Sequence, residues 1–175
     1  MLKLKESGNA FHLPEDWLEQ CRVLVVGCGG SGSEVVDALA RLHFVLKALG
    51  HPGLSITLQD GAQVRAANCG RQRFLPADIG KNKAEVLAAR YGFLMGMDIR
   101  PIPRDCKRSS IIDIASHFDL VISAVDKAAF RVALCNAYVK RRTNSMLADM
   151  GNGAADGQVV FGHLGIPRDN APRLP

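Results

Sequence analysis

The stretch CRVLVVGCGGSGSEVV, residues 21–36, joins an apolar run, a glycine-rich turn and the start of an amphipathic segment. Residues 21–27 are mostly apolar and rich in β-branched side chains, which predicts a buried strand that ends at Gly27. From Ser31 onward the apolar residues recur at helical spacing, so a helix is predicted as far as the turn at 50–53. The expected buried face of this helix consists of Val35, Val36, Leu39, Leu42, Val45, Leu46 and Leu49.

The turn itself has the pattern G-x-G-x-x-G, directly after a strand and directly before a helix. In such a loop the first glycine permits a tight turn, the second lets the backbone approach a phosphate, and the third lets the helix pack on the strand. The helix N-terminus supplies N–H groups to the anion. We therefore predict nucleotide binding by Gly27, Gly29, Gly30 and Gly32. A purely structural turn is the alternative, and Cys28 is expected to be a small buried filler.

The rest of the chain alternates between strand and helix patterns. Further strands are predicted at 54–60, 98–105, 119–125, 145–150 and 157–164, and helices at 83–94, 110–118 and 127–142. This alternation predicts an α/β, Rossmann-like fold, with a mainly parallel sheet covered by helices on both faces. The prolines in 98–105 favour an edge position for that strand. We expect residues 1–175 to form a single domain.

Composition narrows the function further. Hydrophobic residues make up 47% of the 175 residues and charged residues 22%, as in soluble globular proteins. The net charge of +5 suits an anionic ligand, whereas the few scattered aromatic residues argue against direct nucleic-acid binding. The five cysteines contain no C-x-x-C pair, so no zinc site is predicted. With no signal peptide and no apolar run long enough to span a membrane, the expected location is the cytoplasm.

An aspartate and a basic stretch follow the second predicted strand. Asp60 is placed to bind a ribose hydroxyl, although an aspartate before Gly61 is also a common turn residue. The stretch AANCGRQRFLPADIGKNK, residues 66–83, then brings two arginines and two lysines. A dinucleotide-dependent dehydrogenase rarely has such a stretch after its acidic residue. The order of several motifs along the chain is therefore more informative about function than the glycine loop alone.

That set runs in the order Asp60, Asn68, Arg71, Gln72, Lys83 and Asp126, downstream of the glycine loop. It resembles the E1-like family of adenylating enzymes, which includes ThiF, MoeB, HesA and the ubiquitin-activating enzymes. The amino-acid sequence at 39–53, 66–74 and 151–162 is similar to that of one branch of the family, the ThiF-like proteins of bacterial PRTRC cassettes. The resemblance covers about residues 20–165.

The resemblance implies ATP and Mg²⁺ as cofactors, and adenylation of the C-terminal carboxylate of a ubiquitin-like or sulfur-carrier protein. Arg71, Lys83 and Asn68 are the implied catalytic residues, which would hold the phosphates and offset negative charge. Gln72 would contact the nucleotide or order the loop, and Asp126 would bind Mg²⁺. A homodimer is implied as well.

The chain departs from the family pattern at several points. Ala62 replaces the second aspartate of D-x-D, Ala67 stands where serine is usual, and Lys127 follows Asp126 in place of asparagine. Bacterial family members are longer, so the chain is expected to be C-terminally incomplete or a natural short form. Two alternatives stay open: a non-catalytic nucleotide-binding or scaffold member of the same fold, and an NAD-dependent oxidoreductase.

Three further basic residues lie off the motif. Arg73 and Lys81 are expected at the surface. Arg131 is either part of the site or a structural cap, because the family commonly has an arginine near this position. No cysteine is assigned to thioester or persulfide formation.

Overall fold

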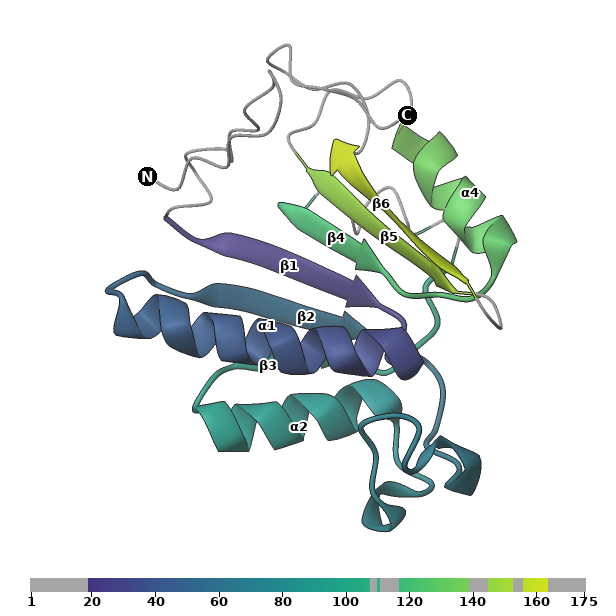
Figure 1. The fold of residues 1–175 in the computed structure, drawn as a ribbon, viewed down its shortest axis with the longest axis horizontal. Coiled ribbons are helices and arrows are strands. Elements are labelled where there is room, and N and C mark those ends of the chain that lie inside the picture. The colour runs from purple at the N-terminus through teal and green to yellow at the C-terminus, as the bar shows by residue number, and fades with distance from the viewer. Residues whose placement is uncertain (1–18, 108–109, 111–116, 139–144, 153–155, 164–175) are drawn as a thin grey trace.

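The computed structural model describes residues 19–107, 110, 117–138, 145–152 and 156–163. In chain order the elements are β1 (Cys21–Val26), α1 (Gly30–Ala48), β2 (Leu54–Gln59), η2 (Ala66–Asn68), η3 (Pro76–Asp78), α2 (Lys83–Met95), β3 (Ile99–Ile102), β4 (Leu120–Ser123), α4 (Ala128–Tyr138), β5 (Met146–Asn152) and β6 (Gly157–His163). The strands form one sheet in the order β3-β2-β1-β4-β5-β6 (Figure 1). All neighbours pair parallel except β5 and β6, which are antiparallel. The predicted Rossmann-like, mainly parallel sheet is therefore confirmed.

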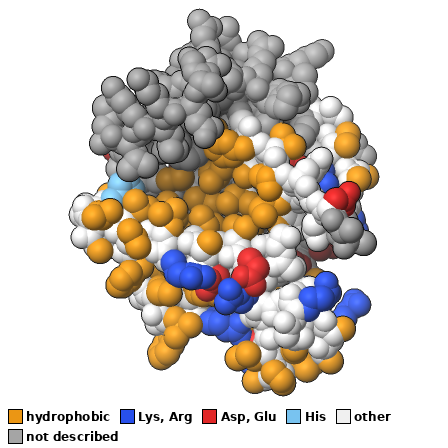
Figure 2. All heavy atoms as spheres, in the orientation of Figure 1, with side chains coloured by type: hydrophobic (Ala, Val, Ile, Leu, Met, Phe, Trp, Pro, Cys, Tyr) orange, Lys and Arg blue, Asp and Glu red, His pale blue; other side chains and the backbone are white. Residues whose placement is uncertain are grey.

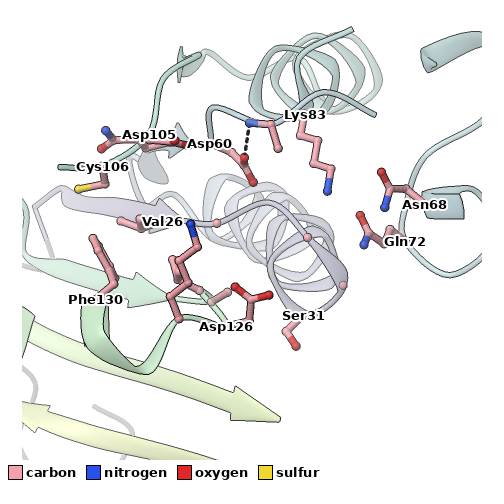
Figure 3. Close-up of a pocket in the computed structure, with 18 of the residues that line it drawn as sticks. Val26, Ser31, Asp60, Asn68, Gln72, Lys83, Asp105, Cys106, Asp126 and Phe130 are labelled. Carbon is pink, nitrogen blue, oxygen red and sulfur yellow. Dashed lines mark hydrogen bonds between the residues drawn. The ribbon is translucent and has the colours of Figure 1, made fainter. Parts of the chain in front are cut away.

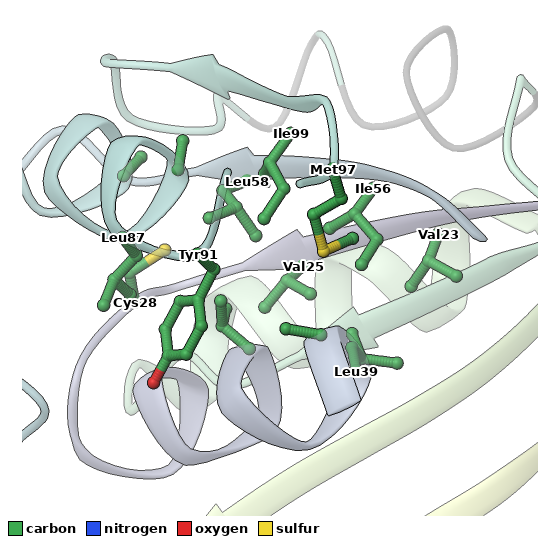
Figure 4. Close-up of a cluster of buried hydrophobic side chains, with 14 of the residues drawn as sticks. Val23, Val25, Cys28, Leu39, Ile56, Leu58, Leu87, Tyr91, Met97 and Ile99 are labelled. Carbon is green, nitrogen blue, oxygen red and sulfur yellow. The ribbon is translucent and has the colours of Figure 1, made fainter. Parts of the chain in front are cut away.

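The helices lie on both faces of the sheet. Val23 and Val25 of β1 belong to the cluster that α1 and α2 complete, with Leu87 and Tyr91 on α2 (Figure 4). Leu24 and Val26 point to the opposite face, where residues of α4 close a second cluster. Because both faces of β1 are covered, nearly every residue of the strand is buried, which explains its continuous apolar run.

Helix α1 ends where its sequence predicts. Gly50 has a φ of +83°, and its N–H donates to the carbonyl of Lys47 at 3.1 Å. The N–H of His51 donates to the carbonyl of Leu46 at 2.9 Å, which completes a Schellman motif. A glycine is favoured at this left-handed position because it has no Cβ.

The predicted buried face of α1 is broader than the face that packs on the sheet. Val36 and Leu39 are buried, but Leu42 is 47% exposed, Val45 51% and Leu49 78%. Leu46 lies farther along the helix than Leu42 and still packs against the core, so this part of α1 remains on the sheet. Leu42, Val45 and Leu49 lie on another side of the helix, away from the core, and hydrophobic side chains gather over α1 at the surface (Figure 2).

The other predicted elements agree with the described part of the chain. Strand β3 lies at an edge of the sheet, as the prolines of 98–105 predict. Most of the predicted helix 110–118 lies outside the described residues, as do the last residues of 127–142. Within the described part, no helix combines the length and the apolar character that a membrane span requires.

Candidate functional site

A cleft of about 590 Å³ opens at the carboxyl ends of β1, β2 and β4. The chain runs outward from β1 to β2 and β3, and then crosses back to β4 on the other side of β1; ligands bind at such a switch point. The predicted site residues that line the cleft are Gly27, Gly29, Gly30, Asp60, Asn68, Arg71, Gln72, Lys83 and Asp126. The structure thus brings together residues that lie up to a hundred positions apart, and Gly32 is the predicted one outside the lining.

The four loop glycines divide into two pairs. Gly27 has a φ of +90°, and a Cβ on it would lie 2.8 Å from the carbonyl oxygen of Ala124. A Cβ on Gly32 would lie 1.9 Å from the carbonyl oxygen of Gly27, so the helix packs directly on the loop. Around Gly29 and Gly30, by contrast, no atom lies within 4 Å of such a Cβ. The first pair shapes the turn, and the second leaves room for a ligand beside the uncapped start of α1.

Asp60 ties the glycine loop to the loop after β2. Its Oδ2 accepts from the N–H of Cys28 at 2.6 Å. Its Oδ1 accepts from the N–H of Ala62 at 2.8 Å, the dashed bond in Figure 3. The second bond is the local turn that an aspartate before Gly61 favours. Cys28 is fully buried, as expected, and burial with the nearby Asp60 carboxylate raises the pKa of its thiol. A structural role of Asp60 is therefore present, and a ribose contact would use its remaining lone pairs.

Asn82 has a role that sequence analysis misses. Its Oδ1 accepts from the N–H of Ala84 at 2.9 Å and so caps α2, while its Nδ2 donates to the carbonyl of Asp60 at 2.8 Å. An asparagine before a helical pattern is a usual N-cap, so the capping signal was available. The cap fixes the helix start that carries Lys83.

Lys83 is a buried cation that points into the cleft (Figure 3). It is the first residue of α2 and is only 9% exposed. Its Nζ lies 5.8 Å from the centroid of the Phe74 ring, a cation–π distance. It forms no salt bridge with any residue that the structure describes. Because a buried charge without a counter-ion is unfavourable, an anionic ligand would stabilise it.

The other donors lie beside Lys83, and we call Asn68, Arg71, Gln72 and Lys83 the basic lobe of the cleft. Asn68 is buried, and its Oδ1 accepts from the N–H of Arg65 at 2.8 Å, which leaves the Nδ2 as a donor. Arg71 is exposed and has no salt bridge within the described residues. These groups supply N–H donors and positive charge that no salt bridge among the described residues neutralises, which suits phosphate oxygens.

The opposite side of the glycine loop has a different character, and we call Val26, Cys106 and Phe130 the apolar lobe (Figure 3). Burial raises the pKa of Cys106 to about 11, so its thiol is neutral at pH 7. Asp105 lies next to it on the segment after β3. Sequence analysis assigns none of these residues to the site, because no motif marks them.

Asp126 lies in the loop between β4 and α4 and is exposed on the cleft. Lys127 follows it in the lining. Among the described residues, no group of three or more His, Cys, Asp or Glu side chains is arranged to hold a metal ion. Asp126 therefore offers a single carboxylate, which suits a cation that is also held by a ligand's phosphates.

The basic residues off the motif lie outside the cleft lining. Arg73 forms a salt bridge with Glu34 at 2.7 Å, beside the first turn of α1. Arg131 forms one with Asp149 at 2.6 Å, and both side chains are largely buried. The structural interpretation of Arg131 thus has direct support, and Lys81 is exposed away from the cleft.

Comparisons with known proteins agree with this architecture. Residues 6–169 match the ThiF family. The chain is 32% identical over 149 residues to the tRNA threonylcarbamoyladenosine dehydratase of Haemophilus influenzae, an alignment of 78% of this chain and 49% of that protein.

Solved structures are similar as well. One is the E. coli tRNA N6-threonylcarbamoyladenosine dehydratase TcdA in complex with ATP, at a TM-score of 0.58 and 28% identity over 69% of this chain and 47% of that one. Another is E. coli MccB with succinimide, at a TM-score of 0.66 and 25% identity over 89% and 44% of the two chains. The chain spans about half the length of the curated relative that it matches.

Proposed function

The chain belongs to the ThiF family of E1-like proteins, and on that basis we propose that it binds ATP in the cleft and adenylates a carboxylate with it. The observation that carries the proposal is the basic lobe beside the glycine loop, above all the buried Lys83 without a salt bridge in the described part of the chain. The ATP complex of the related TcdA supports the choice of nucleotide.

The chemistry explains why such a lobe is needed. An oxygen of the carboxylate attacks the α-phosphorus of ATP, a new O–P bond forms, and the bond from that phosphorus to the bridging oxygen breaks. Pyrophosphate leaves with the electron pair. Two anions approach each other in this step, so Lys83, Arg71 and Asn68 would lower the barrier by stabilising the charge on the phosphates.

Mg²⁺ fits this site through Asp126. The ion prefers octahedral oxygen ligands and commonly uses one or two carboxylates together with phosphates and water. Asp126 supplies one such carboxylate on the cleft. When bound, the ion would neutralise phosphate charge, and Lys127 beside it adds a second positive group.

Further parts of the proposal rest on the resemblance of the motifs. The acceptor would be the C-terminal carboxylate of a ubiquitin-like or sulfur-carrier protein, and the enzyme would act as a cytoplasmic homodimer. Residues 1–175 would form one adenylation domain, of the branch found in PRTRC cassettes. A non-catalytic nucleotide-binding member is the second candidate, because Ala62 replaces the second aspartate of the family pattern.

One experiment separates these functions. Pyrophosphate release is measured with ATP, Mg²⁺ and a small protein that ends in a free Gly-Gly, and each component is left out in turn. An adenylating enzyme releases pyrophosphate only when all three are present, and blocking the Gly-Gly carboxylate as an amide stops release. ATP binding without release under any of these conditions would instead identify the non-catalytic member, and binding of NADH in place of ATP would identify an oxidoreductase.

A substitution at Asp126 tests its assigned role. Asp126→Asn is expected to raise the Mg²⁺ concentration for half-maximal pyrophosphate release by at least about tenfold, since even outer partners of metal ligands typically contribute that much affinity. A Mg²⁺ titration at saturating ATP measures the change. Asp105→Asn is the matched control, because Asp105 is also an exposed carboxylate on the cleft but lies by the apolar lobe. Equal shifts in the two variants would contradict a specific role of Asp126.

A further inference from the structure

A few buried polar atoms make no hydrogen bond within the described part of the chain. They are Gln59 Oε1, Gln72 Oε1, Ser123 Oγ and Asp149 Oδ1. Only the two glutamines also line the cleft. Gln72 belongs to the basic lobe, so Gln59 is the one whose role the proposed function does not yet explain.

Gln59 lies at the floor of the apolar lobe. It is the last residue of β2 and is 1% exposed. Its Cα partner in the parallel pair with β1 is Val26, so the two side chains point to the same face of the sheet. Val26 lines the apolar lobe with Phe130 and Cys106 (Figure 3). The amide of Gln59 is therefore set among apolar neighbours.

Such a placement is unfavourable for the protein alone. A buried amide without hydrogen bonds loses its contacts with water and gains nothing in return. A structural glutamine would be expected to bond to the backbone or to a side chain, but the side chain of Gln59 has no such bond among the described residues. The torsion χ3 of glutamine is broad and roughly two-fold, so the amide can turn either end towards the cleft. Its Oε1 therefore lacks a hydrogen-bond partner among the described residues, and a ligand in the cleft that Gln59 lines could supply one.

We propose that Gln59 reads the base of the bound nucleotide and selects adenine. Its Oε1 accepts from the exocyclic N6 amine of adenine, and its Nε2 donates to N7, a pairing for which glutamine and adenine are complementary. On this edge guanine and hypoxanthine present two acceptors, O6 and N7, so whichever way the amide turns, its oxygen faces an acceptor and one hydrogen bond is lost. The apolar side chains of Val26 and Phe130 provide walls for the ring system. This inference rests on the proposed function only in placing a purine nucleotide in the cleft.

Gln59→Met tests the proposal, because methionine is unbranched, of similar size and without hydrogen-bonding groups of comparable strength. Dissociation constants of ATP and inosine triphosphate are measured by calorimetry on the full chain with Mg²⁺. The wild type is expected to prefer ATP by roughly 10- to 100-fold, the range of a good bidentate pair. In Gln59→Met the preference should fall to within about threefold, mostly through weaker ATP binding.

Gln72→Met is the matched control, since its amide oxygen is also buried and unpartnered but faces the basic lobe. It should weaken ATP and inosine triphosphate by the same factor. A second readout is the thermal midpoint of the free protein. Gln59→Met should match or exceed the wild type, because it removes an unsatisfied buried amide, whereas replacing a glutamine with only a structural role would lower the midpoint.

Three results would overturn the proposal. These are a wild type that binds the two triphosphates equally, a Gln59→Met variant that keeps the wild-type preference, or one that loses stability and affinity for both ligands together. If the variant does not fold, purine riboside triphosphate, which lacks the amine but keeps the ring nitrogen, decides on the wild type: it must bind more weakly than ATP. Selectivity is measured without a carrier protein, so a failure of pyrophosphate release would overturn the proposed function and leave this inference standing.

Discussion

Replacing Lys83 with alanine is expected to slow pyrophosphate release by about 100- to 1,000-fold, the effect typical of removing one preorganised group that stabilises the transition state. The reason lies in the position of Lys83. It is buried, points into the cleft and has no salt bridge within the described residues, so its charge is free to act on a phosphate. The low exposure also weakens screening by water and salt, which makes the interaction stronger than at the surface.

Lys81→Ala is the control for this substitution. Lys81 has the same charge and lies two positions earlier, but it is exposed and does not line the cleft. Release rates with the Gly-Gly carrier and ATP affinities by calorimetry should change less than about twofold, as for most surface substitutions. If the two variants behaved alike, or if Lys83→Ala kept wild-type rates with intact ATP binding, Lys83 would not be part of the catalytic machinery.

The site residues that can be predicted from the sequence are those marked by signals in the neighbouring residues. The glycine loop has its strand and its helix directly on either side, so Gly27 and Gly32 are recognisable from the stretch 21–36 alone. Lys83 and Asp126 are far apart in sequence, but each follows a local signal, a helix start and a strand end. In a parallel sheet such ends meet at one edge, which is why these residues reach the same cleft.

The part that sequence analysis misses depends on tertiary packing. Cys106 and Phe130 enter the cleft from segments without a motif, and only the order of the strands brings them together. In the sequence, Gln59 has no feature that distinguishes it from other strand residues. Its pairing with Val26 in the sheet places it on the face towards α4. Likewise, the broad apolar stripe of α1 does not reveal which part of it meets the sheet: Leu46 packs against the core, whereas Leu42 and Leu49 are exposed.

Gly32→Ala is expected to destabilise the fold by about 3 kcal/mol or more, at the upper end of overpacking effects, and to abolish nucleotide binding. The new Cβ would lie 1.9 Å from the carbonyl oxygen of Gly27 and 2.8 Å from its carbonyl carbon. Both are backbone atoms, so no side-chain rotation relieves the clash, and either the loop or α1 must move. Since Gly27 itself contacts Ala124 closely, a shift of the loop would disturb the end of β4 as well. Urea unfolding monitored by circular dichroism measures the change.

Gly30→Ala makes the comparison decisive, because it adds the same methyl group two residues earlier in the same helix. No atom lies within 4 Å of its Cβ, and alanine favours a helix over glycine by up to about 1 kcal/mol. Stability should therefore stay the same or rise slightly, while ATP affinity falls because the methyl group occupies space in the cleft. The two variants thus separate packing from binding: Gly32→Ala loses both, and Gly30→Ala loses only binding. A Gly32→Ala protein within about 0.5 kcal/mol of the wild type, the range of neutral surface substitutions, would show that the helix does not pack on the loop in this way.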